Sequence, residues 1–137
     1  MGLDLTPPDQ VSRVAVVGGG VIGTGWVLHY LRMGHEVRMF DPIPAARERS
    51  RTMVESIWPL MVDLGLRPGA SMDRLTIVDD LADAVGDAQA VQEAVPEVPE
   101  LKSQLFAQMD GLAPANTVLM TSTSGISMTV IQEACER

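Results

Sequence analysis

The chain has 137 residues, 46% of them hydrophobic, which suits one packed domain and excludes a globally disordered protein. Its formal net charge of -8 disfavours nucleic acid and anionic membranes as partners. No apolar run approaches the ~20 residues of a membrane span, and the N-terminus lacks a signal peptide's basic start. A single cysteine, Cys135, cannot form an internal disulfide, so we expect a cytoplasmic protein.

Residues 1–12 contain two prolines and two aspartates and are expected to form a flexible lead-in. Residues 13–18 follow as a β-branched run that ends in glycines, which predicts a buried parallel strand. Residues 20–33 have apolar side chains at helical spacing, and Gly34 ends that helix. A second strand at 36–41 completes a βαβ unit.

The same alternation continues along the rest of the chain. Further strands are expected at residues 75–78, 88–95 and 117–121. Further helices are expected at residues 45–64, 81–85, 99–111 and 127–136, with Gly111 and Pro114 ending the third of these. This pattern predicts an α/β doubly wound parallel sheet over residues 13–137, with an extended helical segment after the second strand.

Gly18-Gly19-Gly20-Val21-Ile22-Gly23 fits the pattern G-x-G-x-x-G between a predicted strand and a predicted helix. Gly18 permits a tight turn, Gly20 lets the backbone approach a pyrophosphate, and Gly23 allows close packing of helix on strand. The backbone amides of Val21 and Ile22 would then face the phosphates. This context favours a dinucleotide-binding Rossmann fold over a purely structural glycine turn.

Asp41 ends the second predicted strand, about twenty residues after the glycines. An acid at this place accepts hydrogen bonds from the adenosine ribose and repels a 2′-phosphate, so NAD is the expected cofactor rather than NADP. Arg47 is close enough to weaken this preference. We expect it instead on the solvent face of the next helix, beside Arg49 and Arg51.

Three motifs in order resemble the NAD-binding N-terminal domain of the 3-hydroxyacyl-CoA dehydrogenase family. They are residues 16–26 around the glycines, Gln92-Glu93-Ala94-Val95-Pro96-Glu97 with Leu101-Lys102, and Thr121-Ser122-Thr123-Ser124-Gly125. The resemblance covers the chain from about Val14 onward. Residues 57–60, 64–66 and 68–70 look like the branch that oxidises L-carnitine, and L-gulonate 3-dehydrogenase and lens λ-crystallin are also similar.

The resemblance implies roles for the segment after the fourth strand. Glu97 would contact the nicotinamide-side ribose of NAD, and Ala94 and Val95 of the same motif would also lie on the cofactor. Lys102 matches a family lysine that helps to hold the cofactor. The alternative for Lys102 is an ordinary solvated helix lysine.

Ser124 matches a family serine whose hydroxyl would bond the substrate oxygen and position it for hydride loss. Its alternative role is to cap the next helix, which Ser127 could do instead. Ser122 stands where the family has asparagine, so a nicotinamide contact through it is a weaker expectation. Trp58 could offer a cation–π contact to a trimethylammonium group, but we expect it in the core of a helical hairpin.

The family's general base is a histidine on a following strand, paired with a glutamate, and neither lies in this sequence. His29 and His35 fall far from the expected substrate side. We therefore expect a piece of a longer enzyme that binds NAD without turnover. The family's helical C-terminal domain would be missing, and the full-length protein would be a homodimer.

The expected reaction is oxidation of the 3-hydroxyl of a small hydroxy acid similar to L-carnitine, by hydride transfer to NAD. A polyanionic CoA favours lysine contacts, and the stretch from Pro42 to Leu101 contains no lysine, although it has five arginines. Two alternatives stay open. One is a 3-hydroxyacyl-CoA dehydrogenase of fatty-acid oxidation, and the other is a non-catalytic dinucleotide-binding module.

Overall fold

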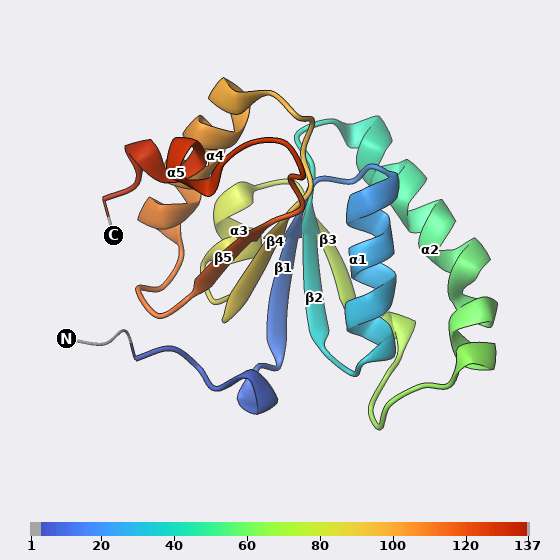
Figure 1. Ribbon diagram of the computed structural model, residues 1–137. Helices are drawn as coiled ribbons and strands as arrows, with labels where there is room; N and C mark the ends of the chain where they lie inside the picture. Colours follow the sequence, from blue (N-terminus) through green and yellow to red (C-terminus); the bar gives the residue numbers. More distant parts are fainter. Residues whose placement is uncertain (1–3, 137) are drawn as a thin grey trace.

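Strand β1 (Arg13–Val17) lies in the middle of a five-stranded parallel sheet with the strand order β3-β2-β1-β4-β5. The computed structural model describes residues 4–136, and Figure 1 shows its arrangement. The other strands are β2 (Glu36–Phe40), β3 (Leu75–Val78), β4 (Ala90–Glu93) and β5 (Val118–Thr121). Each predicted strand is therefore present, and the predicted doubly wound sheet is confirmed.

Helices cover both faces of the sheet (Figure 1). One face carries α1 (Val21–Arg32) and α2 (Pro44–Leu64). The other face carries α3 (Leu81–Val85), α4 (Pro99–Leu112) and α5 (Met128–Ile131). Within the described part of the chain, no helix combines the length and apolarity that a membrane crossing requires.

The hydrophobic core is divided into two layers by the sheet, as expected when helices cover both faces. Val16 packs with Val27, Leu31 and Val54 on the side of α1 and α2. Its neighbours in β1 point to the other side, where Val17 packs with residues of α3, α4 and α5. Because β1 is buried on both sides from Val14 onward, its residues 14–17 are all apolar and do not alternate with polar ones.

The segment after β2 is one helix of 21 residues, which confirms the extended helical segment expected at residues 45–64. The helical hairpin in which we expected Trp58 is not formed. Pro59 lies inside α2, and the helix continues to Leu64, after which Gly65 adopts a φ of 94°. Trp58 is half-buried and packs against the core layer beneath α1 and α2, as expected. The chain then returns to β3 through a loop and a 3₁₀ turn at Met72–Arg74.

Helix ends differ from the sequence expectations in two places. Helix α4 passes through Gly111 and ends at Leu112, one residue before the Ala113–Pro114 pair, because proline disfavours helix in the residue that precedes it. The last expected helix, 127–136, is shorter: α5 covers Met128–Ile131 and tightens into a 3₁₀ turn at Gln132–Ala134. Its β-branched run Thr129-Val130-Ile131 favours helix only weakly.

The segment before β1 contacts the sheet. Pro8–Gln10 forms a 3₁₀ turn, and the Ser12 amide donates a hydrogen bond of 2.8 Å to Gln89 Oε1. Residues 1–3 of the expected lead-in lie outside the described residues.

The strand order places the carboxyl ends of β1 and β4 side by side at a switch in chain direction. From β1 the chain builds outward through β2 to β3, and then crosses back to place β4 on the other side of β1. The helices that follow β1 and β4 therefore diverge. A crevice between such helices, outside the carboxyl ends of the strands, is where α/β sheets bind ligands.

Candidate dinucleotide and substrate site

A cavity of about 890 Å³ opens at this crevice. The glycine turn after β1, the end of β2, the segment after β4 and the loop after β5 all contribute to its wall, together with apolar side chains of α4. A smaller hollow of about 520 Å³ lies between α2 and β3 and is lined by charged side chains such as Arg51 and Asp83. The glycine turn borders the larger cavity only, so this cavity is the candidate site.

The three motif glycines meet different steric demands. Gly18 has a φ of 117°, and a Cβ there would lie 2.4 Å from the Ala94 carbonyl oxygen. A Cβ on Gly23 would lie 1.8 Å from the Gly18 carbonyl oxygen, so helix α1 can lie this close to the turn only with glycine. A Cβ on Gly20 would meet nothing within 4 Å, because this position faces the open cavity. That free space fits a pyrophosphate lying against the backbone.

The amides at the start of α1 also fit an anion. Gly20 is the N-cap residue and offers no side chain to the first turn of the helix. The first amides of a helix have no acceptor within the helix itself, and the helix dipole makes this end positive. Val21 and Ile22 line the cavity at this point.

The carboxylate of Asp41 is fastened by two backbone amides. Its Oδ2 accepts a hydrogen bond of 2.8 Å from the Gly19 amide, and its Oδ1 accepts one of 2.8 Å from the Ile43 amide. Each carboxylate oxygen keeps further acceptor capacity, so both can still receive ribose hydroxyls. The acid that we expected at the adenosine side therefore also ties the glycine turn to the entry of α2.

The expected position of Arg47 on the solvent face is wrong. Arg47 is half-buried, and its Nη1 donates a hydrogen bond of 2.7 Å to the backbone carbonyl of Asp41. It lies in the first turn of α2, from which a long side chain reaches back over the end of β2. Arg49 lines the cavity, and Arg51 stands beside Glu48 on the exposed surface.

Glu97 lies just beyond β4, at the rim of the cavity, with Ala94 and Val95 between it and the strand. Its Oε2 accepts a hydrogen bond of 2.7 Å from the Thr123 hydroxyl, and its Oε1 lies 3.1 Å from Lys102 Nζ. The hydrogen bond from Thr123, supported by Lys102, lowers the pKa of Glu97 below its usual value. Glu97 is therefore an ionised acceptor held from two different elements.

Lys102, the chain's single lysine, is fully buried, so its alternative interpretation as a solvated helix lysine is wrong. Its Nζ donates to the carboxylate of Glu93, which is also fully buried, and to the Val95 carbonyl oxygen at 3.1 Å. Thr121 donates to the second oxygen of Glu93. Lys102 thus connects a buried carboxylate at the end of β4 with Glu97 at the cavity.

Sequence reasoning assigned no role to Glu93, Thr121 or Thr123. A signal was present, because an ionisable residue at the end of a buried strand requires a partner of opposite charge. The only lysine stands nine residues later, at a distance that lets a helix fold back onto the strand.

The two candidate serines lie in different environments. Ser124 is exposed and lines the cavity, where its hydroxyl is accessible to a substrate. Ser122 is half-buried, and its Oγ accepts hydrogen bonds of 2.9 Å from Trp26 Nε1 and 2.9 Å from Gln92 Nε2. Ser127 accepts from the Thr129 amide and caps α5, so the capping role that was the alternative for Ser124 belongs to Ser127.

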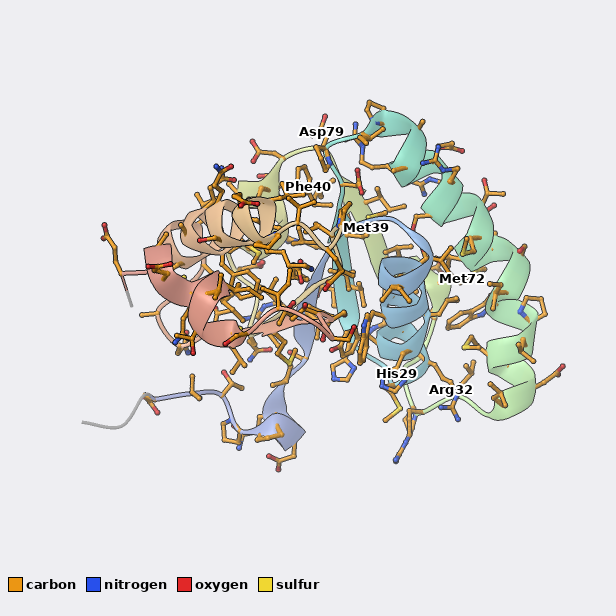
Figure 2. The ribbon with its side chains drawn as sticks, turned by 45° about the horizontal axis from the view of Figure 1, so that its top comes forward. His29, Arg32, Met39, Phe40, Met72 and Asp79 are labelled. Atoms are coloured by element: carbon orange, nitrogen blue, oxygen red, sulfur yellow. The ribbon has the colours of Figure 1, made fainter. Side chains whose placement is uncertain are left out.

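The two histidines lie away from the cavity, as expected. In Figure 2, His29 and Arg32 lie at one end of the molecule, whereas Phe40 and Asp79 mark the carboxyl ends of β2 and β3 at the other. His29 packs edge-on against Trp26, and His35 Nδ1 lies 3.2 Å from the Tyr30 carbonyl oxygen. Among residues 4–136, no histidine lines the cavity.

A glycine turn opening α1, an acid ending β2 and a cavity at the switch point together define a dinucleotide-binding Rossmann domain. Residues 13–137 match the family model described as 3-hydroxyacyl-CoA dehydrogenase, NAD binding domain. The chain belongs to this family, and NAD is its cofactor.

Comparison with individual proteins supports the same family assignment. The L-carnitine dehydrogenase of Streptomyces coelicolor is 51% identical over 93% of this chain, and that of Bacillus cereus is 42% identical over 94%. The crystal structure of 3-hydroxybutyryl-CoA dehydrogenase from Escherichia coli superimposes on 93% of this chain with a TM-score of 0.83 and 32% identity, and the match covers 28% of that structure's chain. An NAD⁺-dependent dismutase, 5-formyl-3-hydroxy-2-methylpyridine 4-carboxylic acid 5-dehydrogenase, has a TM-score of 0.84 at 32% identity, with 93% of this chain and 41% of that chain covered. The matches to the two L-carnitine dehydrogenases each cover 40% of the relative's length.

Proposed function

We propose that this chain is the NAD-binding part of an enzyme that oxidises the 3-hydroxyl of a small hydroxy acid similar to L-carnitine. The observation that carries this proposal is the 51% identity, over nearly the whole chain, to a protein named L-carnitine dehydrogenase. Seven further relatives of the same name are 38–50% identical. Two features of the cavity support the NAD half of the proposal. The space beside Gly20 is open, and the Asp41 carboxylate is held in place by a hydrogen bond from the Gly19 amide.

The candidate site residues have distinct tasks in this scheme. The amides of Val21 and Ile22 and the bare backbone of Gly20 hold the pyrophosphate, and Asp41 accepts the adenosine ribose hydroxyls. Ala94 and Val95 line the central part of the cofactor, and Ser122 is the candidate nicotinamide contact. NAD supplies the hydride acceptor.

The remaining residues serve the ribose and the substrate. Glu97 accepts the nicotinamide-side ribose. Lys102, which also lines the cavity, helps to hold the cofactor through its ion pair with Glu97. Ser124 donates its hydroxyl hydrogen to the substrate oxygen and orients the carbon that loses hydride. No histidine of the described residues lines the cavity, so neither His29 nor His35 is placed to accept the proton of the substrate hydroxyl.

A 3-hydroxyacyl-CoA dehydrogenase of fatty-acid oxidation is the second candidate, favoured by the family description and by the Escherichia coli neighbour. Against it stands the absence of lysine from α2 and the following loop, although the five arginines of this stretch could substitute for lysine as cations that contact a polyanionic CoA. Arg47, Arg49 and Arg51 belong to α2, and Arg67 and Arg74 belong to the loop and the 3₁₀ turn that follow it.

The deciding measurement is the ratio of kcat/KM values for L-carnitine, L-gulonate and 3-hydroxybutyryl-CoA with the full-length protein. We expect L-carnitine to be preferred. A higher value for the CoA thioester would overturn the carnitine assignment and support the second candidate. A full-length protein that binds NAD and oxidises none of the three would support a non-catalytic dinucleotide-binding module.

The assembly and location of the full-length protein also belong to this proposal. The family resemblance supports a homodimer. The single cysteine supports a reducing compartment, which is the cytoplasm. Burial raises the pKa of the Cys135 thiol, which disfavours a reactive thiolate.

A further inference from the structure

The hydroxyl of Ser122 receives two hydrogen bonds from groups on other elements. Trp26 reaches it from α1, with 2.9 Å between Nε1 and Oγ, and Gln92 reaches it from β4, with 2.9 Å between Nε2 and Oγ. The Ser122 amide also donates to the Glu93 carbonyl oxygen at 2.9 Å, which continues the pairing of β4 and β5 by one residue. Ser122 is therefore held at both its backbone and its side chain.

These two hydrogen bonds leave the Ser122 hydroxyl able only to donate its own hydrogen. An indole N–H can only donate, and a serine oxygen has two acceptor positions and one hydrogen. With Trp26 and Gln92 occupying both acceptor positions, the hydroxyl can only donate its hydrogen to a further group. Its hydrogen-bonding character is set by its neighbours before any ligand arrives.

The two donors are themselves held in place. The Trp26 ring is stacked on Tyr30 with centroids 5.6 Å apart, and it contacts the edge of His29. Gln92 is buried, and its Oε1 lies 3.4 Å from the Tyr30 hydroxyl, so that its Nε2 is directed to Ser122. Tyr30 thus supports both donors from one helix.

Ser122 lines the cavity on the side opposite Asp41. Asp41 follows β2 and marks the adenosine end of the dinucleotide, and the glycine turn after β1 marks its pyrophosphate. The far end of the cofactor therefore lies beyond β4, next to Ser122, which follows β5. On a nicotinamide ring, the group that a fixed donor complements is the carboxamide oxygen, because it only accepts.

We propose that Trp26 and Gln92 are positioning residues that hold Ser122 as a fixed hydrogen-bond donor to the carboxamide oxygen of nicotinamide. This inference rests on the proposed function, since it requires NAD in the cavity. It gives Trp26 a role beyond the hydrophobic core, and it explains how serine serves at a position where the family has asparagine.

The test compares two ligands that differ only in nicotinamide. Calorimetry with the 137-residue chain measures the binding of NAD and of ADP-ribose, which keeps the adenosine, the pyrophosphate and the second ribose. Ser122→Ala should weaken NAD binding about tenfold and leave ADP-ribose binding within about twofold, because one hydrogen bond of about 1–1.5 kcal/mol is lost. A merely structural role for Ser122 would change both ligands alike.

Trp26, one of the two positioning residues, is tested by its own variant with a matched control. Trp26→Phe keeps an aromatic ring against Tyr30 and removes the indole N–H together with the rest of the five-membered ring, so NAD binding should fall about threefold and ADP-ribose binding should not. Trp58→Phe makes the same change in a tryptophan that packs against the core under α2, and it should alter neither ligand. Adding Trp26→Phe to Ser122→Ala should cause no further loss, because Trp26 acts through the hydroxyl.

The outcomes separate this inference from the proposed function. Equal losses for NAD and ADP-ribose in Ser122→Ala, or no loss for either, would overturn the inference and leave the NAD site in place. An unmodified chain that binds neither ligand would overturn the proposed function, and the inference with it.

Discussion

The carboxylate of Asp41 accepts hydrogen bonds from two backbone amides and is also the group expected to bind the adenosine ribose. Its two oxygens accept hydrogen bonds from the Gly19 and Ile43 amides, which hold the carboxylate at the end of β2. The nearby Arg47 is directed to the Asp41 carbonyl oxygen, so its guanidinium is already engaged. Both facts favour NAD over NADP.

We expect Asp41→Ala to weaken NAD binding about tenfold or more, because it removes a charged acceptor of the ribose hydroxyls. The preference for NAD over NADP should shrink in the same variant, and calorimetry with both cofactors measures this. Asp79→Ala is the control, since Asp79 is an exposed acid after the neighbouring strand β3, outside the large cavity. Unchanged NAD binding in Asp41→Ala, or tighter binding of NADP by the unmodified chain, would contradict the assignment.

Lys102 and Glu93 form an ion pair in which both side chains are fully buried. Removing one member of such a pair leaves an uncompensated buried charge, which costs about 3–5 kcal/mol of unfolding free energy. Removing both members is far less costly, because two well-packed apolar side chains need no partner.

Lys102→Met should therefore be strongly destabilised, and the double variant Glu93→Met/Lys102→Met should recover much of the loss. Urea denaturation at neutral pH gives the free energy of unfolding for each. If the double variant is as unstable as the sum of the two single variants, the pair is not an energetically coupled unit.

At the level of elements, the turn between β1 and α1 contains one glycine that folding requires and another that cofactor binding requires. Gly23 is required for packing, since a Cβ there would lie 1.8 Å from a backbone oxygen, whereas Gly20 faces open space. Gly23→Ala should lower the melting temperature markedly. Gly20→Ala should leave it nearly unchanged and abolish most NAD binding, because the new methyl group occupies the place of the pyrophosphate.

Thermal unfolding and calorimetry on the same two samples check this pair of expectations, and each variant serves as the other's control. A Gly20→Ala chain that binds NAD normally would show that the pyrophosphate does not lie against this turn.

The helices and strands also show where sequence patterns are informative. All five strands were predictable from their short β-branched or apolar runs. The extent of α4 and α5 was not, because Gly111 did not end α4 and the β-branched run Thr129-Val130-Ile131 favours helix only weakly. Periodicity locates an element, whereas its neighbours decide where it ends.

For the whole molecule, we expect NAD binding without catalysis. The described cavity has a carboxylate, Glu97, and a serine, Ser124, but no histidine to take the hydroxyl proton. The lowered pKa of Glu97 makes it a poor base near neutral pH. Incubation of the 137-residue chain with NAD and L-carnitine should give no sustained rise in NADH absorbance. Steady NADH production from a chain purified to homogeneity would contradict this expectation.

The sequence by itself determined the fold class, the family and the cofactor. These depend on local features: β-branched runs, a glycine turn whose steric demands are met by consecutive residues, and an acid at a fixed spacing along the chain. The positions of Gly18, Gly20, Gly23 and Asp41 needed no knowledge of distant contacts.

Only the tertiary structure decided what the distant residues do for one another. It turned Lys102 from a possible surface lysine into the buried partner of Glu93, brought Arg47 back to Asp41, and joined Trp26, Gln92 and Ser122 at one hydroxyl. These contacts join residues up to 96 positions apart. They arise because parallel strands bring their carboxyl ends to one edge of the sheet, where side chains from separate elements meet.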